Sequence, residues 1–370
     1  MLMQMLLKSG LRSEEQMSKY WSEVVKKIEP YVPGEQPRDR KYIKINTNEN
    51  PYPPSPRVID AIRRATDERL KLYPDPTCDG LKGAIAEYYE LEKEQVFVGN
   101  GSDEILAFAF QAFFNPGKPI LFPEVTYTFY PVYARLYDIS YRTVPMKANL
   151  GIPVEKFFEE NGGVIFPNPN APTGMYLTPE EIKSILDNNS ERVIIIDEAY
   201  IDFGGESAIR FIQENPNLLV VKTMSKSRAL AGMRVGYALG NKELIEGLER
   251  IKNSFNSYTM DTLALTGATE AIKDEAYFEE TRAKIIRTRQ RLSEDLSKIG
   301  FTVAESMANF VFARHETYRA QLLFEQLKER GILVRYFKKP MIENYLRISI
   351  GTDEEMDIFI KAVKEIIFKK

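Results

Sequence analysis

The chain has 370 residues, 44% hydrophobic and 28% charged, which is the composition of an ordinary globular protein. Its 50 lysines and arginines nearly balance 53 aspartates and glutamates, so the formal charge of −3 gives no electrostatic reason to expect binding to nucleic acid or to an anionic membrane. One cysteine, Cys78, and one histidine, His315, argue against an intrachain disulfide, a thiolate cluster and a multi-histidine metal centre, and we expect a cytoplasmic protein without a metal.

The amino-terminal residues 1–40 are expected to form an arm with one helix. The segment MSKYWSEVVKKIEPY, which begins at Met17, has an amphipathic pattern. The preceding MLMQMLLKSG lacks a basic start and a small-residue cleavage site, so residues 1–16 are expected to be an upstream extension. No apolar stretch approaches the ~20 residues that cross a bilayer, and we expect no membrane segment.

Residues 41–250 predict a large α/β domain. Short β-branched runs alternate there with helical patterns such as DEILAFAFQAFF and TPEEIKSILDNN, the second opened by Thr178 and Pro179 as N-cap and first helical residue. Strands that are apolar on both faces and alternate with helices indicate a mostly parallel sheet flanked by helices. The expected strands lie in EQVFVGNG, KPILFPEV, GGVIFPNPN, RVIIIDEAY, NLLVVKTMS and GMRVGYALG.

The pattern changes after residue 250. A long charged helical sequence, FEETRAKIIRTRQRLSEDLSKIG, precedes the strand-like segments FTVAESMANFVFAR, GILVRYF and YLRISIG. Residues 251–370 are therefore expected to form a smaller α+β domain.

Polar or glycine-rich sequence follows four of the expected strands. Open parallel sheets bind ligands at the carboxyl ends of their strands, and those ends lead here into GNGSD, PNPNAPTG, DEAY and SK. Each has a structural explanation when taken alone, as a glycine turn, a proline-rich loop or a helix cap. The glycines form no dinucleotide fingerprint, because Glu104 stands where the third glycine belongs, and they form no P-loop.

Lys226 is harder to explain by structure alone. A lysine at the end of a buried strand is poorly solvated, and poorly solvated amines are the nucleophiles that Schiff-base chemistry needs. Ser225 and Arg234 supply a hydroxyl and a cation that can clamp a phosphate. Asp197, on the adjacent strand end, can pair with a protonated pyridine nitrogen. Together these residues point to one cofactor, pyridoxal phosphate.

The motifs and their order resemble the fold-type I pyridoxal-phosphate aminotransferases, and within them the histidinol-phosphate aminotransferase family. The matching motifs are IKINTNENPYPPSP, KLYPDP, GNGSDEI, PTG, DEAY, SK with Arg234 eight residues on, and YLRISIGT, over about residues 30–355. The lysine–arginine motif with DEAY upstream is specific to the superfamily, whereas NENPYPPSP and LRISIGT favour the histidinol-phosphate branch. The resemblance implies the fold-type I transferase fold and a homodimer.

The resemblance also implies roles for single residues. Lys226 would form the covalent link to the cofactor and then move protons, Asp197 would pair with the ring nitrogen, and Tyr200 would bond the ring's phenolic oxygen. The other implied cofactor contacts are Gly101, Ser102, Asp103, Thr223, Ser225 and Arg234 at the phosphate, Tyr127 on the ring face, and Tyr73 of the neighbouring subunit.

One position departs from the family's pattern. The family usually has Asn-Pro-Thr-Gly, whose asparagine touches the phenolic oxygen, but here Ala171 precedes Pro172. Asn170 or Asn168 would have to replace that contact, and we expect Asn170 to do so.

The implied reaction is transamination between L-histidinol phosphate and 2-oxoglutarate, giving imidazole-acetol phosphate and glutamate, in histidine biosynthesis. Arg335 and Arg347, which could also be surface ion pairs, match positions that bind the substrate phosphate or the acceptor carboxylate. Tyr31 and Asn309 match the surroundings of the imidazole end. An aromatic or broad-range aminotransferase and a phosphothreonine decarboxylase remain alternatives. A regulator built on this fold would need a DNA-binding module, for which residues 1–40 are too few.

Overall fold

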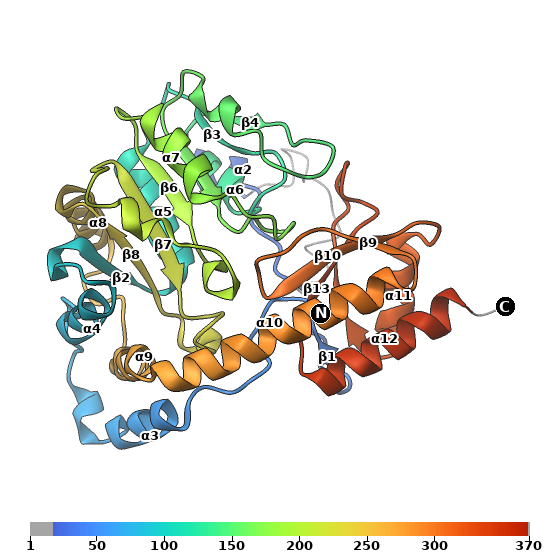
Figure 1. Ribbon diagram of the computed structural model, residues 1–370. Coiled ribbons are helices and arrows are strands. Elements are labelled where there is room, and N and C mark those ends of the chain that lie inside the picture. Colours follow the sequence, from blue (N-terminus) through green and yellow to red (C-terminus); the bar gives the residue numbers. More distant parts are fainter. Residues whose placement is uncertain (1–17, 369–370) are drawn as a thin grey trace.

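The computed structural model describes residues 18–368, which form a large and a small domain (Figure 1). The expected extension at residues 1–16 lies outside the described residues. Between residues 18 and 40 the structure describes one short helix, α2 (Glu23–Lys27), capped by Ser22. The amphipathic pattern therefore gives only five helical residues, and Val24 and Val25 on this helix are exposed. Helices this short are marginal in water unless they pack against a core.

The large domain is built on a seven-stranded sheet with the order β2–β8–β7–β6–β5–β3–β4. Strand β8 is antiparallel to both of its neighbours, and the other pairs are parallel, which confirms the predicted mostly parallel sheet. The strands are β2 (Val96–Gly99), β3 (Ile120–Pro123), β4 (Tyr141–Val144), β5 (Val164–Pro167), β6 (Ile194–Asp197), β7 (Leu218–Thr223) and β8 (Gly236–Gly240).

Helices cover both faces of this sheet. Alternate residues of β7 lie in different apolar clusters, Leu218 and Val220 on one face and Leu219 and Val221 on the other, as the two-residue repeat of a strand requires. Thr178 and Pro179 begin α7 as N-cap and first helical residue, as predicted, and Thr178 also forms a capping box with Glu181. The helices are α3 (Pro56–Ala65), α4 (Asp79–Tyr89), α5 (Gly101–Phe113), α6 (Tyr130–Leu136), α7 (Pro179–Asp187), α8 (Lys242–Phe255) and α9 (Thr262–Lys273).

The small domain has a four-stranded antiparallel sheet, β12–β13–β10–β9, packed against helices (orange to red in Figure 1). The strands are β9 (Phe301–Val303), β10 (Phe310–His315), β12 (Arg335–Tyr336) and β13 (Leu346–Ser349), and the helices are α10 (Glu275–Ser297), α11 (Ala320–Glu329) and α12 (Asp353–Ile367). A separate parallel pair joins β1 (Ile43–Lys44) to β11 (Ile332–Leu333).

The two domains exchange elements near their expected boundaries. Helix α9 lies beyond residue 250, but its Ala264 and Ala268 belong to the large-domain core, and the helix packs on α3 and α4. Strand β1 lies after residue 40 but pairs with β11 of the small domain. The long helix α10 then runs from α9 to the small domain (Figure 1). The small domain therefore starts at α10, because long-range packing rather than local composition sets the boundary.

The sheet register brings the polar strand ends together. Asp197 at the end of β6 is opposite Pro167 of β5 on one side and Val221 of β7 on the other. Gly236, the first residue of β8, is opposite both Gly99 of β2 and Thr223 of β7. The four strand ends singled out in the sequence thus lie at one edge of the sheet. None of the helices within residues 18–368 has the length and apolar character that a membrane crossing requires.

Candidate active site

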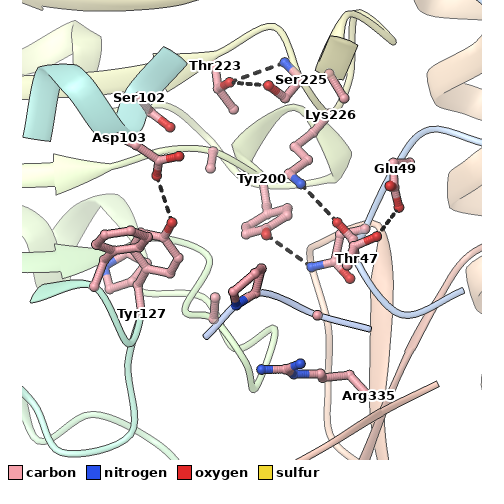
Figure 2. A pocket seen from close by; sticks show the side chains of 18 of the residues that line it. Thr47, Glu49, Ser102, Asp103, Tyr127, Tyr200, Thr223, Ser225, Lys226 and Arg335 are labelled. Carbon is pink, nitrogen blue, oxygen red and sulfur yellow. Dashed lines mark hydrogen bonds between the residues drawn. The ribbon is translucent and has the colours of Figure 1, made fainter. Parts of the chain in front are cut away.

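A cavity of about 450 Å³ opens at this edge of the sheet and is closed from the other side by residues 31–49 and by the small domain. Figure 2 shows Lys226 and Tyr200 pointing toward the segment that contains Thr47, with Ser102 and Thr223 at one end of the cavity and Arg335 at the other. Twelve of the predicted residues line it: Tyr31, Ser102, Asp103, Tyr127, Asp197, Tyr200, Thr223, Ser225, Lys226, Arg234, Arg335 and Arg347.

One end of the cavity is built to hold an anion. Helix α5 begins there, and its N-cap, Asn100, makes no side-chain cap, which leaves the first-turn N–H groups free. The hydroxyls of Ser225 and Thr223 and the guanidinium of Arg234 converge on the same point, with Arg234 Nη1 3.4 Å from Ser225 Oγ. A Cβ atom at Gly236 would lie 2.5 Å from the Ser102 backbone nitrogen, so only glycine allows this approach.

Gly101 does not line the cavity but supports the anion site from behind. Its φ of +80° lets the chain turn sharply from β2 into α5. Any Cβ at this position would lie 2.5 Å from Arg234 Nη2, so the glycine makes room for the guanidinium. Arg234 is also held by Asp103, whose Oδ2 accepts from Nη2 at 3.2 Å.

Asp197 is a buried carboxyl without a cationic partner among residues 18–368. Tyr130 Oη donates to its Oδ2 at 3.1 Å and the Ala199 backbone N–H donates to its Oδ1 at 3.2 Å. Burial raises the pKa of Asp197 to about 7, because these two hydrogen bonds offset only part of the desolvation of the charge. A cation placed against this carboxyl would therefore be strongly attracted.

Lys226 lies between the anion site and the amino-terminal segment. Its amine is half-buried and donates to the Thr47 carbonyl at 3.1 Å (Figure 2). The next residue is fixed in the protein interior, where Ser227 Oγ donates to Asp202, which also accepts from the buried Lys222 at 2.8 Å. The backbone at Lys226 is thus held in place, while its amine has one hydrogen-bond partner among the described residues, the Thr47 carbonyl.

Two guanidinium groups line the opposite end of the cavity. Arg335 of β12 and Arg347 of β13 are direct cross-strand partners, and no carboxylate within residues 18–368 lies within 4.0 Å of either. Burial lowers the pKa of Arg347, and the positive charge of Arg335 lowers it further. Arg347 Nη2 donates to the Asn46 carbonyl at 3.1 Å, while its buried Nε has no partner. Like charges in this register are destabilising unless an anion binds between them.

The structure does not bring Asn170 to the cavity wall. Its amide donates to the Val125 carbonyl and to Thr173 Oγ1, both at 3.0 Å, and its Oδ1 is buried without a partner. Asn168 is committed to Leu177, whose carbonyl and N–H it binds. The residue that faces the cavity is Ala171, which has no hydrogen-bonding side chain.

Two further predicted residues lie away from the cavity of this chain. Tyr73 is 81% exposed and stacks on Tyr258 with ring centroids 4.7 Å apart. Asn309 is fully buried and donates to the Asn48 carbonyl at 3.0 Å. Asn309 therefore supports the segment that lines the cavity, whereas the side chain of Tyr73 is available to another molecule.

Several site residues could not be found from the sequence. Tyr130 is the hydroxyl donor to Asp197, and the only signal for it was a second tyrosine three residues after Tyr127. Thr47 binds Lys226 through its backbone carbonyl, which no side-chain pattern can reveal. Asn48 donates to Tyr200 Oη at 3.0 Å and lies in the motif NTNENP.

The arrangement fits pyridoxal phosphate. The anion site at the start of α5 suits its phosphate, the unpartnered Asp197 suits a protonated ring nitrogen, and the Lys226 amine lies between them in reach of an aldehyde. When bound, this cofactor supplies a ring that withdraws electrons from the substrate carbon.

Comparison with known proteins agrees with this chemistry. The model of the family "Aminotransferase class I and II" matches residues 40–363. The histidinol-phosphate aminotransferase of Clostridium acetobutylicum is 59% identical over 95% of this chain and 100% of its own length. The crystal structure of a histidinol-phosphate aminotransferase from the same organism is similar with a TM-score of 0.81 and 28% identity, over 88% of this chain and 98% of that chain.

A second solved structure is similar over almost the whole chain. The histidinol-phosphate aminotransferase of Sinorhizobium meliloti, determined in complex with pyridoxal-5'-phosphate, has a TM-score of 0.87 at 24% identity and covers 95% of this chain and 99% of that chain. Sequence, fold and site geometry agree: this chain belongs to the class I and II aminotransferase family, in its histidinol-phosphate aminotransferase branch, and is a pyridoxal-phosphate-dependent aminotransferase.

Proposed function

We propose that the enzyme transfers an amino group between L-histidinol phosphate and 2-oxoglutarate, a step of histidine biosynthesis. The observation that supports this choice is the cross-strand pair Arg335 and Arg347, which has no carboxylate partner within residues 18–368 and lies at the end of the cavity away from the cofactor-phosphate site. Guanidinium forks bind phosphate and carboxylate alike, so one pair serves both the donor and the acceptor.

The other residues of the site have the following roles in this proposal. Ser102, Ser225, Thr223 and Arg234 hold the cofactor phosphate, and Tyr127 packs on the ring face. Asp197 keeps the ring nitrogen protonated, since a buried carboxylate gains most from a cation beside it. The amine of Lys226 forms the covalent link and, once displaced by substrate, moves a proton at the substrate carbon. Tyr200 donates to the ring oxygen, and Tyr31 borders the imidazole end.

A spectrum of the purified protein before and after addition of L-histidinol phosphate tests the proposal, because the absorbance of the bound cofactor changes when its aldehyde form becomes the amine. Phenylalanine, tyrosine and phosphothreonine are compared under the same conditions. Faster turnover of an aromatic amino acid would favour the broad-range alternative. Release of carbon dioxide from phosphothreonine without need for 2-oxoglutarate would favour the decarboxylase alternative.

We also propose that the functional unit is a cytoplasmic homodimer. Tyr73 does not line the cavity of its own chain and is 81% exposed, which suits a residue that completes the cofactor-phosphate site of a second copy. Leu70, Leu72 and Phe255 are also exposed, and exposed apolar side chains of this kind are what an interface buries. The cytoplasm is consistent with a single buried cysteine that forms no disulfide.

A further inference from the structure

The segment Asn46–Asn50, which follows β1, contacts several reactive groups at once. The Asn46 carbonyl accepts from Arg347 at 3.1 Å and the Thr47 carbonyl accepts from the Lys226 amine at 3.1 Å. The side-chain amide of Asn50 donates to the backbone carbonyl of Lys226 at 3.0 Å. Figure 2 shows this segment crossing the cavity opposite Lys226 and Tyr200. In the middle of the segment, Asn48 makes a side-chain contact with a group expected to touch the cofactor.

Asn48 is held by four hydrogen bonds. Its Nδ2 donates to Tyr200 Oη at 3.0 Å, its backbone N–H donates to Ser349 Oγ at 2.9 Å, and Ser349 Oγ donates to Asn48 Oδ1 at 2.7 Å. The Asn48 carbonyl accepts from Asn309. Because Ser349 Oγ already accepts from a backbone N–H, its single proton is directed to Oδ1, and this leaves the amide N–H for Tyr200. The side chain is almost fully buried, so water does not compete for these bonds.

The direction of the Asn48–Tyr200 bond decides what the tyrosine can do. A phenol has one proton to donate. Since Asn48 donates to Tyr200 Oη, that proton is not used on Asn48 and is available to an acceptor in the cavity. A hydroxyl that accepts one hydrogen bond is also a stronger donor in the next.

The alanine at position 171 increases the weight that the Asn48–Tyr200 hydrogen bond carries, because Ala171 has no hydrogen-bonding side chain. Ala171 lines the cavity where the family usually places an asparagine, and neither Asn168 nor Asn170 turns its amide into the cavity. Tyr200 is therefore left as the side-chain donor to the ring oxygen that the missing asparagine would have shared.

We propose that Asn48 is a positioning residue of this reaction: its amide, fixed by Ser349, orients Tyr200 so that the hydroxyl donates its proton to the ring oxygen of bound pyridoxal phosphate. This inference rests on the proposed function, in which Tyr200 touches that oxygen. A donated proton stabilises negative charge on the ring oxygen and so makes the conjugated nitrogen that joins the cofactor to Lys226 easier to deprotonate.

The test is an absorbance titration of the bound cofactor against pH, on the holoenzyme. Asn48→Gly removes the amide while still accepting the φ of +58° at this position. We expect its spectral transition to move to higher pH by up to about one unit, in the same direction as Tyr200→Phe, because a hydrogen bond to a charged acceptor is weakened. The double variant should show no larger shift than Tyr200→Phe alone, since both changes remove the same bond. The Asn48→Gly change should lower kcat more than it raises KM.

Two further variants make the result decisive. Ser349→Ala leaves the Asn48 amide in place but without the hydroxyl that fixes it, and should shift the spectral transition in the same direction by a smaller amount. If Asn48→Gly does not fold, Ser349→Ala provides the test in its place. Asn189→Gly removes another buried asparagine, whose amide binds the Phe157 and Ile185 carbonyls away from the cavity, and should leave the transition unchanged. Shifts that add in the double variant, or no shift in both Asn48→Gly and Ser349→Ala, would overturn the inference. A wild-type protein that does not link the cofactor to Lys226 would instead refute the proposed function.

Discussion

Lys226 and Asp197 are both needed for the proposed chemistry, yet the protein holds them by different means. The amine of Lys226 is half-buried and has one backbone carbonyl as its partner, so it can leave that partner to react. Asp197 is buried and fixed by Tyr130 and Ala199. A reactive group needs freedom at its tip, whereas a group that acts through its charge needs a fixed position in a poorly solvated place.

The first prediction at this scale concerns Lys226. Lys226→Ala should abolish turnover and leave the protein folded, because the amine supplies both the covalent link and the proton transfer, and proton transfer alone contributes roughly 10²–10⁴-fold. Borohydride treatment of the wild type followed by peptide mapping should place the reduced cofactor on Lys226. Lys339→Ala is the matched control, because Lys339 is another partly buried lysine, and burial lowers its pKa. A label on Lys339 would contradict the assignment.

The second prediction concerns Asp197 in the protein freed of its cofactor. The folded-state pKa of about 7 lies above the ordinary value of 3.8, so the folded protein binds a proton there that the unfolded chain has lost. The stabilising contribution is complete below about pH 4 and is lost as the pH rises to about 7, on the order of 4 kcal/mol in total.

Urea unfolding at several pH values, for wild type and for Asp197→Asn, measures this contribution. The unfolding free energy of the wild type should fall relative to that of Asp197→Asn as the pH rises from about 4 to about 7. Above that range the difference between the two proteins should stay constant. Adding the cofactor should reduce this dependence of the unfolding free energy on pH, because a ring cation beside Asp197 favours the charged carboxyl. A difference in unfolding free energy that does not vary with pH would contradict the raised pKa of Asp197.

At the scale of elements, the antiparallel pair β12–β13 carries the two arginines that we propose bind the substrate anions. Its register places Arg335 directly opposite Arg347, and the rings of Phe310 and Phe337 lie 5.3 and 5.5 Å from the Arg347 guanidinium. Two cations on adjacent strands weaken the sheet unless their charge is neutralised. In the proposed function, a bound phosphate or carboxylate would neutralise the two charges and recover the stability that their repulsion costs the free protein.

The third prediction follows from this pair. Arg347→Ala should weaken the binding of both histidinol phosphate and 2-oxoglutarate by roughly ten- to hundredfold, since a hydrogen bond to a charged group contributes about 1.5–3 kcal/mol. Dissociation constants for the two substrates on the holoenzyme measure the effect. Arg314→Ala is the matched control, because this small-domain arginine is exposed and does not line the cavity. A loss limited to one of the two substrates would show that the pair does not serve both.

At the scale of the whole molecule, we propose that a second copy of the chain completes each cavity with its Tyr73. Tyr73 and Tyr258 stack at the surface, and Tyr73 has no contact with the cavity of its own chain. Most soluble oligomers are symmetric dimers, in which a residue that crosses the interface does so twice.

The fourth prediction tests this sharing of sites. Tyr73→Ala and Lys226→Ala subunits should each have little activity alone, and mixing them under conditions of subunit exchange should restore about a quarter of the wild-type sites, because each hybrid dimer has one site with both residues intact. The double variant Tyr73→Ala/Lys226→Ala, mixed with either single variant, forms no intact site and is the control. A fully active monomer in sedimentation measurements would exclude the shared site.

Local pattern was enough to predict most elements of the fold. The runs VIIID and NLLVVK became β6 and β7, and Thr178 and Pro179 begin α7. These features depend on periodicity and on neighbours within a few residues, which a sequence contains directly. The positions of Lys226, Asp197 and Arg234 at the sheet edge followed from the rule that parallel strands end together.

Only the tertiary structure decided the contacts between residues far apart in the chain. It placed α9 in the large domain and β1 in the small one, because apolar surface is buried wherever complementary surface is available. It also directed Asn170 away from the cavity and set Asn48 against Tyr200, which is 152 residues away. Composition and spacing along the chain could not reveal these pairings, since hydrogen bonds and side-chain directions depend on how separate segments pack in space.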